Sequence, residues 1–236
     1  MELRTFGELL ELLFVAQPNP PLWMVGTTGV VALLAVAYRP VWRVARNVIT
    51  IVHEGGHAVV ALLTGRRLRG IRLHSDTSGV TVSVGPPSGP GMVFTILAGY
   101  TAAPLLGAAY AGVLALDRVT LLLWLSIALL VLLLVAIRNV YGVIAVFATG
   151  GVIFLVSWFG HPQVQSGFAY FFTWFLLLGG VWPVVELQRK RGRREAPDSD
   201  ADQLARLTRV AGLFWVVLFG GVALGAAVLG GRWLLL

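Results

Sequence analysis

The sequence predicts an all-α polytopic membrane protein with about seven transmembrane helices and a small β-hairpin between the second and third of them. Of its 236 residues, 57% are hydrophobic and only 12% are charged, and the mean hydropathy is +0.83. A soluble domain carries about 25% charged residues and about 45–50% apolar ones. The apolar residues also gather in runs of about 20, the length with which a helix crosses a hydrocarbon core about 30 Å thick.

These runs form the predicted spans, which we place within a single transmembrane domain of residues 21–236. They cover residues 21–38, 40–64, 92–116, 119–137, 140–159, 167–187 and 211–229. Residues 1–20 form an interfacial segment before them, in which Leu3, Phe6 and Leu10 recur at helical spacing among acidic residues and predict a short amphipathic helix. The segment lacks a basic n-region and a small-residue cleavage site, so we do not interpret it as a signal peptide.

Strand-like alternation occurs between the second and third spans, in residues 68–90. Apolar residues alternate with polar ones on both sides of a turn at 74–79, namely Leu68, Ile71, Leu73, Val80, Val82 and Val84. A proline-rich loop closes the segment. The pattern predicts a hairpin at the membrane surface.

Composition excludes several classes of protein. Cysteine is absent, which rules out a disulfide-stabilised scaffold, a thiolate nucleophile and a Cys-ligated metal site. The 18 Lys and Arg residues exceed the 11 Asp and Glu residues, for a formal net charge of +7. In a membrane protein this excess indicates topology and contact with lipid headgroups rather than nucleic-acid binding. We therefore expect the lipid bilayer as a partner and no nucleic acid.

The basic residues also predict an orientation. Four arginines at 66–72 and a basic linker at 188–200, with more arginines just after it, fall on one side if all the spans cross. The positive-inside rule places this side and the N-terminus in the cytoplasm. Arg39, Arg43 and Arg46 count against this orientation, because they fall at the opposite end of the second span. The Arg- and Ala-rich composition is typical of bacteria of high genomic GC content and favours a bacterial cytoplasmic membrane.

Inside the second span, His53-Glu54-Gly55-Gly56-His57 forms an H-E-x-x-H motif. Residues four apart share one face of a helix, so both imidazoles can bind one tetrahedral Zn²⁺. Glu54 lies about 100° around the helix, where its carboxylate can reach a water molecule on the metal without being a ligand. Such a carboxylate takes a proton from water and passes it to a leaving amine, which is the chemistry of metallopeptidases.

This motif is specific, but it leaves alternatives open. With four His and six Glu in the chain, composition alone gives it an expectation of about one in a thousand. Ionisable side chains near the bilayer centre cost about 2.5–3.5 kcal/mol each, so three within five residues need a common reason, and a metal supplies one. The alternatives are a polar cluster in a non-catalytic scaffold or regulator, and a metal or proton transporter. The other spans hold few ionisable residues, which disfavours transport.

A polytopic chain with this motif in an early helix, followed by a basic strand-loop segment, resembles the site-2 protease class of intramembrane zinc metallopeptidases, family M50. The short layout with H-E-G-G-H, Gly79-Val80-Thr81 and Ser199-Asp200-Ala201 is similar to the M50B-like bacterial branch. The resemblance covers most of the chain. It implies hydrolysis of peptide bonds in or near the transmembrane segment of a membrane-anchored protein substrate, with water reaching zinc from the cytoplasmic side.

The resemblance also implies a third protein ligand, an Asp from a later helix. The better-known family pattern places this Asp directly before Gly, and no Asp-Gly occurs in this chain. Asp200 is the first choice, because Ser-Asp-Ala matches the M50B-like pattern and lies on the predicted active-site side, and Asp202 is the second. The alternative is that both carboxylates only favour the positive end of a helix.

Two further predictions concern the substrate. An unwound substrate segment that pairs with an exposed strand edge would present an extended backbone to the metal. Leu73, Val80 and Val82 are therefore candidate substrate-positioning residues, with a purely structural hairpin as the alternative. Asn139 can donate a hydrogen bond to the developing oxyanion, with Arg138 nearby. Alternatively, the two residues form a connection at the headgroup level with Arg138 snorkelling.

Overall fold

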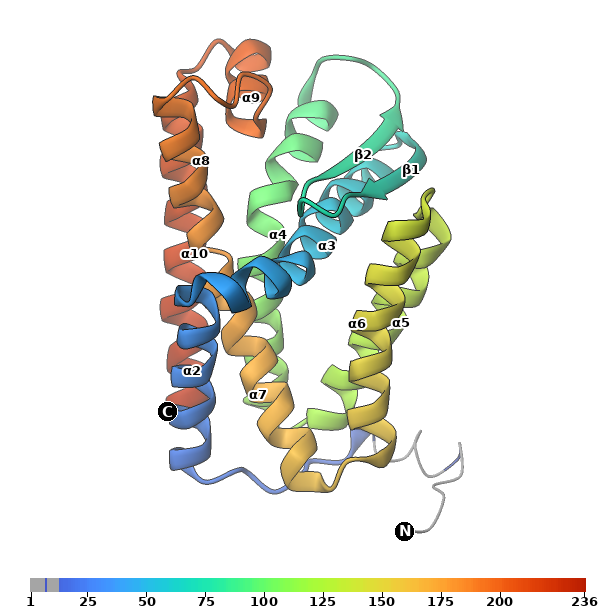
Figure 1. Cartoon of the computed structure of the whole chain (residues 1–236), viewed down its shortest axis with the longest axis vertical. Helices are drawn as coiled ribbons and strands as arrows, with labels where there is room; N and C mark the ends of the chain where they lie inside the picture. Colours follow the sequence, from blue (N-terminus) through green and yellow to red (C-terminus); the bar gives the residue numbers. More distant parts are fainter. Residues whose placement is uncertain (1–6, 8–12) are drawn as a thin grey trace.

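The computed structural model describes residue 7 and residues 13–236, so most of the predicted N-terminal amphipathic helix lies outside the described residues. The described chain forms helices and one two-stranded sheet (Figure 1). In chain order these are α2 (Leu22–Ala37), α3 (Arg39–Leu63), β1 (Arg67–Leu73), β2 (Gly79–Val84), α4 (Pro90–Leu114), α5 (Val119–Ala136), α6 (Val140–Phe159), α7 (Pro162–Gly179), α8 (Trp182–Gly192), α9 (Asp200–Thr208) and α10 (Gly212–Leu235).

The number of helices that can cross a membrane is smaller than the sequence predicts. Within the described residues, five spans are long and apolar enough, and a sixth results if α2 and α3 count as one bent span. The five are α4, α5, α6, α10 and the segment Pro162–Gly192, which holds α7 and α8. The prediction of a helical membrane protein with a small two-stranded sheet is confirmed, whereas the predicted count of about seven spans is not.

The difference arises at Tyr38, where α2 and α3 meet at an angle of 101°. Tyr38 is extended (φ −84°, ψ 106°), and Pro40 lies in the first turn of α3. Proline lacks an amide hydrogen and clashes with the carbonyl four residues earlier, so one continuous helix cannot run through this position undisturbed. As a result, α3 runs obliquely across the bundle toward the hairpin (Figure 1).

The bend brings the basic start of α3 against α8. α8, α9 and the hairpin lie toward the same end in Figure 1, and Arg46 of α3 pairs with Glu186 of α8 at 3.2 Å. Arg39 and Arg43 line the same cavity as the basic end of α8. Arg39, Arg43 and Arg46 do lie at the end of α3 that is far from the hairpin, but α3 does not run from one end of the bundle to the other, so this position does not place them on the opposite side of the membrane.

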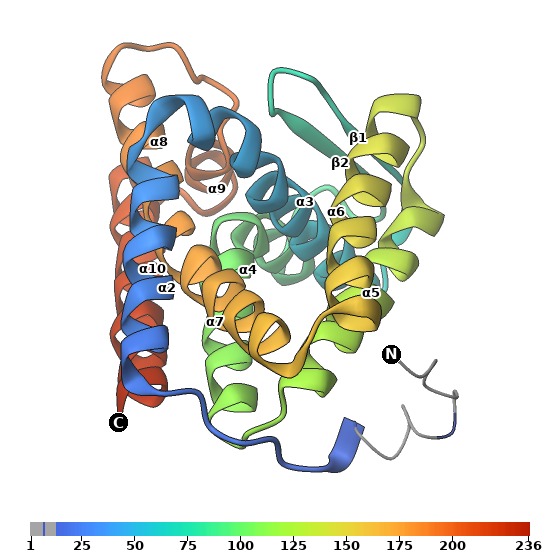
Figure 2. The same cartoon turned by 60° about the horizontal axis from the view of Figure 1, so that its bottom comes forward.

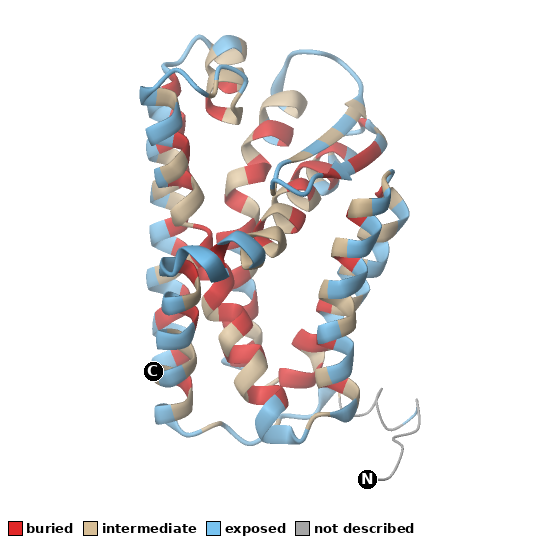
Figure 3. Cartoon of the chain, in the orientation of Figure 1, coloured by how far each residue is buried: buried red, intermediate tan, exposed pale blue. Residues whose placement is uncertain are grey.

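The bundle is apolar both inside and on much of its outer surface. α4 and α7 lie between α2 and α10 on one side and α5 and α6 on the other (Figure 2), and the main core includes Tyr110, Leu122 and Leu176. Buried residues face inward and exposed ones outward (Figure 3). Leu132 and Phe147 are 69% and 72% exposed. Helices that are apolar on all sides are typical of membrane spans.

The hairpin has one covered edge and one free edge. β1 and β2 pair antiparallel, with Leu73 opposite Gly79. The other edge of β1 lies against the α5–α6 connection, where the amide of Arg138 donates to the carbonyl of Ile71 at 2.9 Å. Asn139 Oδ1 accepts a hydrogen bond from the amide of Leu73 at 3.2 Å. Among the described residues no further strand pairs with β2, so the free edge belongs to β2.

Candidate metal centre

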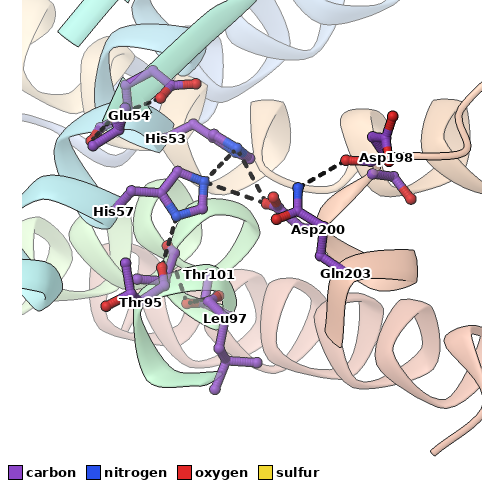
Figure 4. A network of polar contacts seen from close by, with 12 residues as sticks. His53, Glu54, His57, Thr95, Leu97, Thr101, Asp198, Asp200 and Gln203 are labelled. Atoms are coloured by element: carbon purple, nitrogen blue, oxygen red, sulfur yellow. Dashed lines mark hydrogen bonds and ion pairs between the residues drawn. The ribbon is translucent and has the colours of Figure 1, made fainter. Parts of the chain in front are cut away.

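His53 and His57 lie one turn apart on α3 and face the same point (Figure 4). Their Nε2 atoms are 3.1 Å apart. The ring centroids are 4.7 Å apart, and the ring planes are almost perpendicular. The folded chain thus has both imidazoles on one helix face, as the four-residue spacing predicts.

The second ring nitrogen of His57 is held by α4. Nδ1 lies 2.7 Å from the carbonyl oxygen of Thr95, to which it donates its hydrogen. A neutral imidazole carries a single N–H, so Nε2 keeps a free lone pair. Hydrogen bonds of this kind fix the ring orientation and tautomer of metal-binding histidines.

Asp200 brings a carboxylate from α9, far along the chain, to the same point. Its Oδ2 atom lies 3.4 Å from Nε2 of His53 and 3.4 Å from Nε2 of His57. This oxygen is buried and has no hydrogen-bond partner. Burial of a carboxylate oxygen is unfavourable unless a donor or a cation compensates it. The position therefore favours a bound cation.

The three atoms have the separations that a tetrahedral zinc site requires. Zinc bonds of about 2.0–2.1 Å to nitrogen and oxygen place neighbouring ligands about 3.3–3.4 Å apart. The observed separations are 3.1, 3.4 and 3.4 Å. His53, His57 and Asp200 form a group that could hold a metal ion. Two imidazole nitrogens and one carboxylate fit Zn²⁺ and leave one tetrahedral position without a protein ligand.

Capping of α9 determines which of its carboxylates reaches the imidazoles. Ser199 is the N-cap residue, and its hydroxyl donates to Asp202 Oδ2 at 2.6 Å. Arg191 of α8 donates to both carboxylate oxygens of Asp202, at 2.8 and 3.0 Å. These hydrogen bonds from Arg191 hold the pKa of Asp202 below its ordinary value. Asp202 is thus engaged with α8, and Asp200 faces the imidazoles.

The short helix α9 is held inside the protein by its apolar residues. Ala201 and Leu204 are fully buried and pack in one cluster with Ile96 of α4 and Phe219 of α10. Backbone polar groups can lie at membrane depth when protein rather than lipid surrounds them. This packing allows Asp200 to reach α3.

Glu54 lies beside His53 but outside the group of potential ligands (Figure 4). It is 4% exposed, and its Oε2 accepts a hydrogen bond from Thr81 Oγ1 of β2 at 2.6 Å. β2 approaches so closely that a Cβ on Gly79 would lie 2.5 Å from Cγ of Glu54. The hairpin therefore positions the Glu54 carboxylate. The strand pattern in the sequence could not predict that Thr81 makes this contact.

Gly99 of α4 forms the wall against which both imidazoles lie. A Cβ at this position would overlap Nε2 of His57 and lie 2.7 Å from Cε1 of His53. The next residue, Tyr100, packs edge-on against His53 with ring centroids 4.9 Å apart. In the sequence, Gly99 belongs to a row of small residues that recur every four positions in residues 92–116, a pattern that indicates close packing of helices. This pattern alone does not predict that Gly99 contacts the imidazoles.

Gly99→Ala is expected to reduce metal binding about tenfold or more, because the added methyl group overfills the site and displaces both rings. Metal analysis of the purified protein measures the effect. Gly151→Ala in α6 is the matched control, since a Cβ there meets nothing within 4 Å. Full metal content in Gly99→Ala would contradict the proposed position of the metal.

Asn139 and Leu73 bind one another. Asn139 Nδ2 donates to the carbonyl of Leu73 at 2.7 Å, and its Oδ1 accepts from the amide of the same residue. The Asn139 amide thus anchors the hairpin at the α5–α6 connection, and the backbone groups of Leu73 are already paired. The predicted roles of Asn139 at an oxyanion and of Leu73 at the substrate stay predictions. Val80 and Val82 are 49% and 47% exposed, and their contact with substrate stays a prediction.

The chain is an integral membrane protein with a candidate metal centre, because a His/His/Asp group lies within a bundle of helices that can cross a membrane. The model of the Peptidase M50B-like family matches residues 27–230, a range that includes α3, the hairpin and α9. The chain belongs to this family of metallopeptidases. Comparison with curated proteins and with solved structures gave no match.

Proposed function

We propose that this protein is a zinc-dependent intramembrane endopeptidase, which hydrolyses peptide bonds in or near the transmembrane segments of membrane-anchored proteins. One observation carries the proposal. The buried Oδ2 of Asp200 has no hydrogen-bond partner and lies 3.4 Å from Nε2 of both His53 and His57. The two imidazoles form only ion-pair contacts with this oxygen, without hydrogen-bond geometry, so a bound cation would compensate it better than either N–H group. Residues 21–236 would act as one catalytic unit.

Each residue of the site has a distinct role in this proposal. His53, His57 and Asp200 would hold Zn²⁺, which polarises the scissile carbonyl and lowers the pKa of water to about 7. Glu54 lies beside this group, so its carboxylate would accept a proton from the attacking water and return it to the leaving amine. Thr81 keeps the carboxylate oriented through its hydroxyl.

Thr81→Val is expected to lower turnover about 10–100-fold with unchanged metal content, because valine keeps the shape of threonine but leaves the Glu54 carboxylate without its donor. Steady-state cleavage assays and metal analysis measure the two quantities. Thr81→Ser keeps the hydroxyl and should retain most of the activity. Full activity in Thr81→Val together with a loss in Thr81→Ser would show that the methyl group, and not the hydrogen bond, is required.

The free edge of β2 supports a mode of substrate presentation. Ile71 and Leu73 direct their backbone groups toward the α5–α6 connection. In an antiparallel pair the residues opposite them, Thr81 and Gly79, then direct theirs away from β1. An extended substrate segment would pair there, next to Glu54. We therefore move the proposed substrate edge from Leu73 to Gly79 and Thr81.

The distribution of charge supports an active site on the cytoplasmic side. Among the described Lys and Arg residues, Arg118 follows α4 and Arg232 lies in the last turn of α10, at helix ends away from α9 and the hairpin. Most of the others lie on α8, on the hairpin or between α8 and α10. By the positive-inside rule, the end with the excess of Lys and Arg faces the cytoplasm. Water would then reach the site from the cytoplasm, and the cleaved substrate would be released to it. We propose that the membrane is a bacterial cytoplasmic membrane.

Cleavage of membrane proteins in the presence and absence of metal tests the proposal. Vesicles of bacterial membrane that receive the purified chain are expected to yield new peptide termini inside transmembrane segments, detected by mass spectrometry. A zinc chelator should stop the cleavage, and added Zn²⁺ should restore it. Absence of stoichiometric zinc would favour a scaffold instead, and zinc flux into sealed vesicles without cleavage would favour a transporter.

A further inference from the structure

A basic cavity separate from the metal centre lies between the end of α2, the start of α3 and α8. It has a volume of about 910 Å³, within the range of about 300–1,000 Å³ that ligand pockets span. One carboxylate, that of Glu186, faces the cavity together with Trp42 and Trp182. The cationic residues that line it are Arg39, Arg43, Arg46, Arg189, Lys190 and Arg193.

Most of this positive charge has no partner within the described protein. Glu186 pairs with Arg46 at 3.2 Å, but no described carboxylate pairs with Arg39, Arg43 or Lys190. Like charges around one cavity repel each other, most strongly where the membrane lowers the dielectric constant. An anion bound between them would relieve this repulsion.

The surroundings of the cavity fit a lipid better than a soluble anion. Val30, Leu33 and Ala37 share one face of α2 by their spacing, and Ala37 lines the cavity. Val30 and Leu33 are 57% and 53% exposed, so an apolar face leads directly to the basic residues. Trp182, with the guanidinium of Arg189 over its ring, adds an aromatic side chain of the kind that is typical of the headgroup level, whereas Trp42 is buried in the core. An acidic peptide or free phosphate would leave the apolar face unused.

We propose that this cavity binds the phosphate headgroup of an anionic phospholipid from the surrounding leaflet, with the acyl chains along α2. Guanidinium groups bind phosphate with paired hydrogen bonds, and basic pockets between membrane helices bind acidic headgroups. The site joins α3, which carries both imidazoles, to α8, which holds α9 through Arg191 and Asp202. A bound lipid would brace the two elements that bring His53 and Asp200 together. The proposal does not depend on the peptidase function.

Native mass spectrometry of the full chain in a neutral detergent tests the site. Titration with phosphatidylglycerol is expected to give one retained lipid per chain, and phosphatidylcholine should not be retained. The variant Arg39→Gln/Arg43→Gln/Arg189→Gln should bind phosphatidylglycerol about a hundredfold more weakly, roughly fivefold for each cation. The matched control, Arg67→Gln/Arg69→Gln/Arg72→Gln, removes three exposed arginines from β1 and should bind as the wild type does.

Several outcomes would overturn the proposal. Equal weakening in both triple variants would assign binding to overall surface charge, and equal retention of the two lipids by the wild type would exclude headgroup recognition. Inorganic phosphate at millimolar concentration should not displace the lipid. Displacement by phosphate, or by a synthetic acidic peptide, would identify a soluble ligand instead. The comparison of the two lipids uses only the wild type, so it holds even where a variant fails to fold.

Discussion

Glu54→Gln is expected to slow peptide-bond hydrolysis by about 10²–10⁴-fold while bound zinc stays at the wild-type level. Glutamine keeps the size of glutamate and can still accept the hydrogen bond from Thr81, but it cannot take a proton from water. The side chain stands outside the group of potential ligands, so the metal should remain. Cleavage of vesicle proteins and metal analysis of the same preparation measure the two effects.

Glu195→Gln is the matched control for this variant. Glu195 is an exposed residue of the linker after α8, and its replacement should leave cleavage and zinc content unchanged. Full activity in Glu54→Gln would remove the proton-transfer role from Glu54. Loss of zinc together with activity would make Glu54 part of the metal site itself.

Asp200→Asn is expected to lower zinc affinity by more than about a hundredfold, since even residues that only orient a ligand contribute about 10–100-fold. Asparagine preserves the packing of α9 but removes the negative charge that faces both imidazoles. Cleavage should fall in parallel at limiting zinc. Competition with a chelator of known zinc affinity gives the change in affinity directly.

Two neighbouring carboxylates serve as controls. Asp198 has an 86% exposed side chain and pairs with Arg206 at 3.1 Å, so Asp198→Asn should bind zinc normally. Asp202→Asn removes the ion pair with Arg191 and could shift α9 slightly. It should therefore weaken zinc binding less than Asp200→Asn does. A larger loss of zinc affinity in Asp202→Asn than in Asp200→Asn would make Asp202, and not Asp200, the third ligand.

The features that could be predicted from the sequence are those that depend on local patterns. Runs of apolar residues are sufficient to recognise a membrane bundle, and alternation on both sides of a polar turn is sufficient for the hairpin. The spacing of His53 and His57 places both rings on one face in any α-helix. These predictions need no knowledge of which helices are neighbours.

The remaining features depend on contacts between distant segments. Helix spacing does not separate Asp200 from Asp202, and only the family resemblance ranks Asp200 first; in the folded chain Arg191 of another helix binds Asp202 and leaves Asp200 facing α3. The contact of Gly99 with the imidazoles requires α4 to lie against α3. The pairing of Asn139 with β1 likewise depends on tertiary structure. Hydropathy averaged over a window cannot register the bend at Tyr38, so it counts α2 and α3 as two crossings.

The oblique path of α3 has a consequence for the membrane as an electrical barrier. α3 ends at the hairpin, so the hydrated chamber that hydrolysis needs can open to one compartment while the rest of the bundle stays sealed. Leu122, Leu176 and Leu177, all at most 1% exposed, belong to the apolar plug on the other side. Proton conduction would require polar groups across this plug. The proposed hydrolysis would then not require a continuous polar path from one side of the membrane to the other.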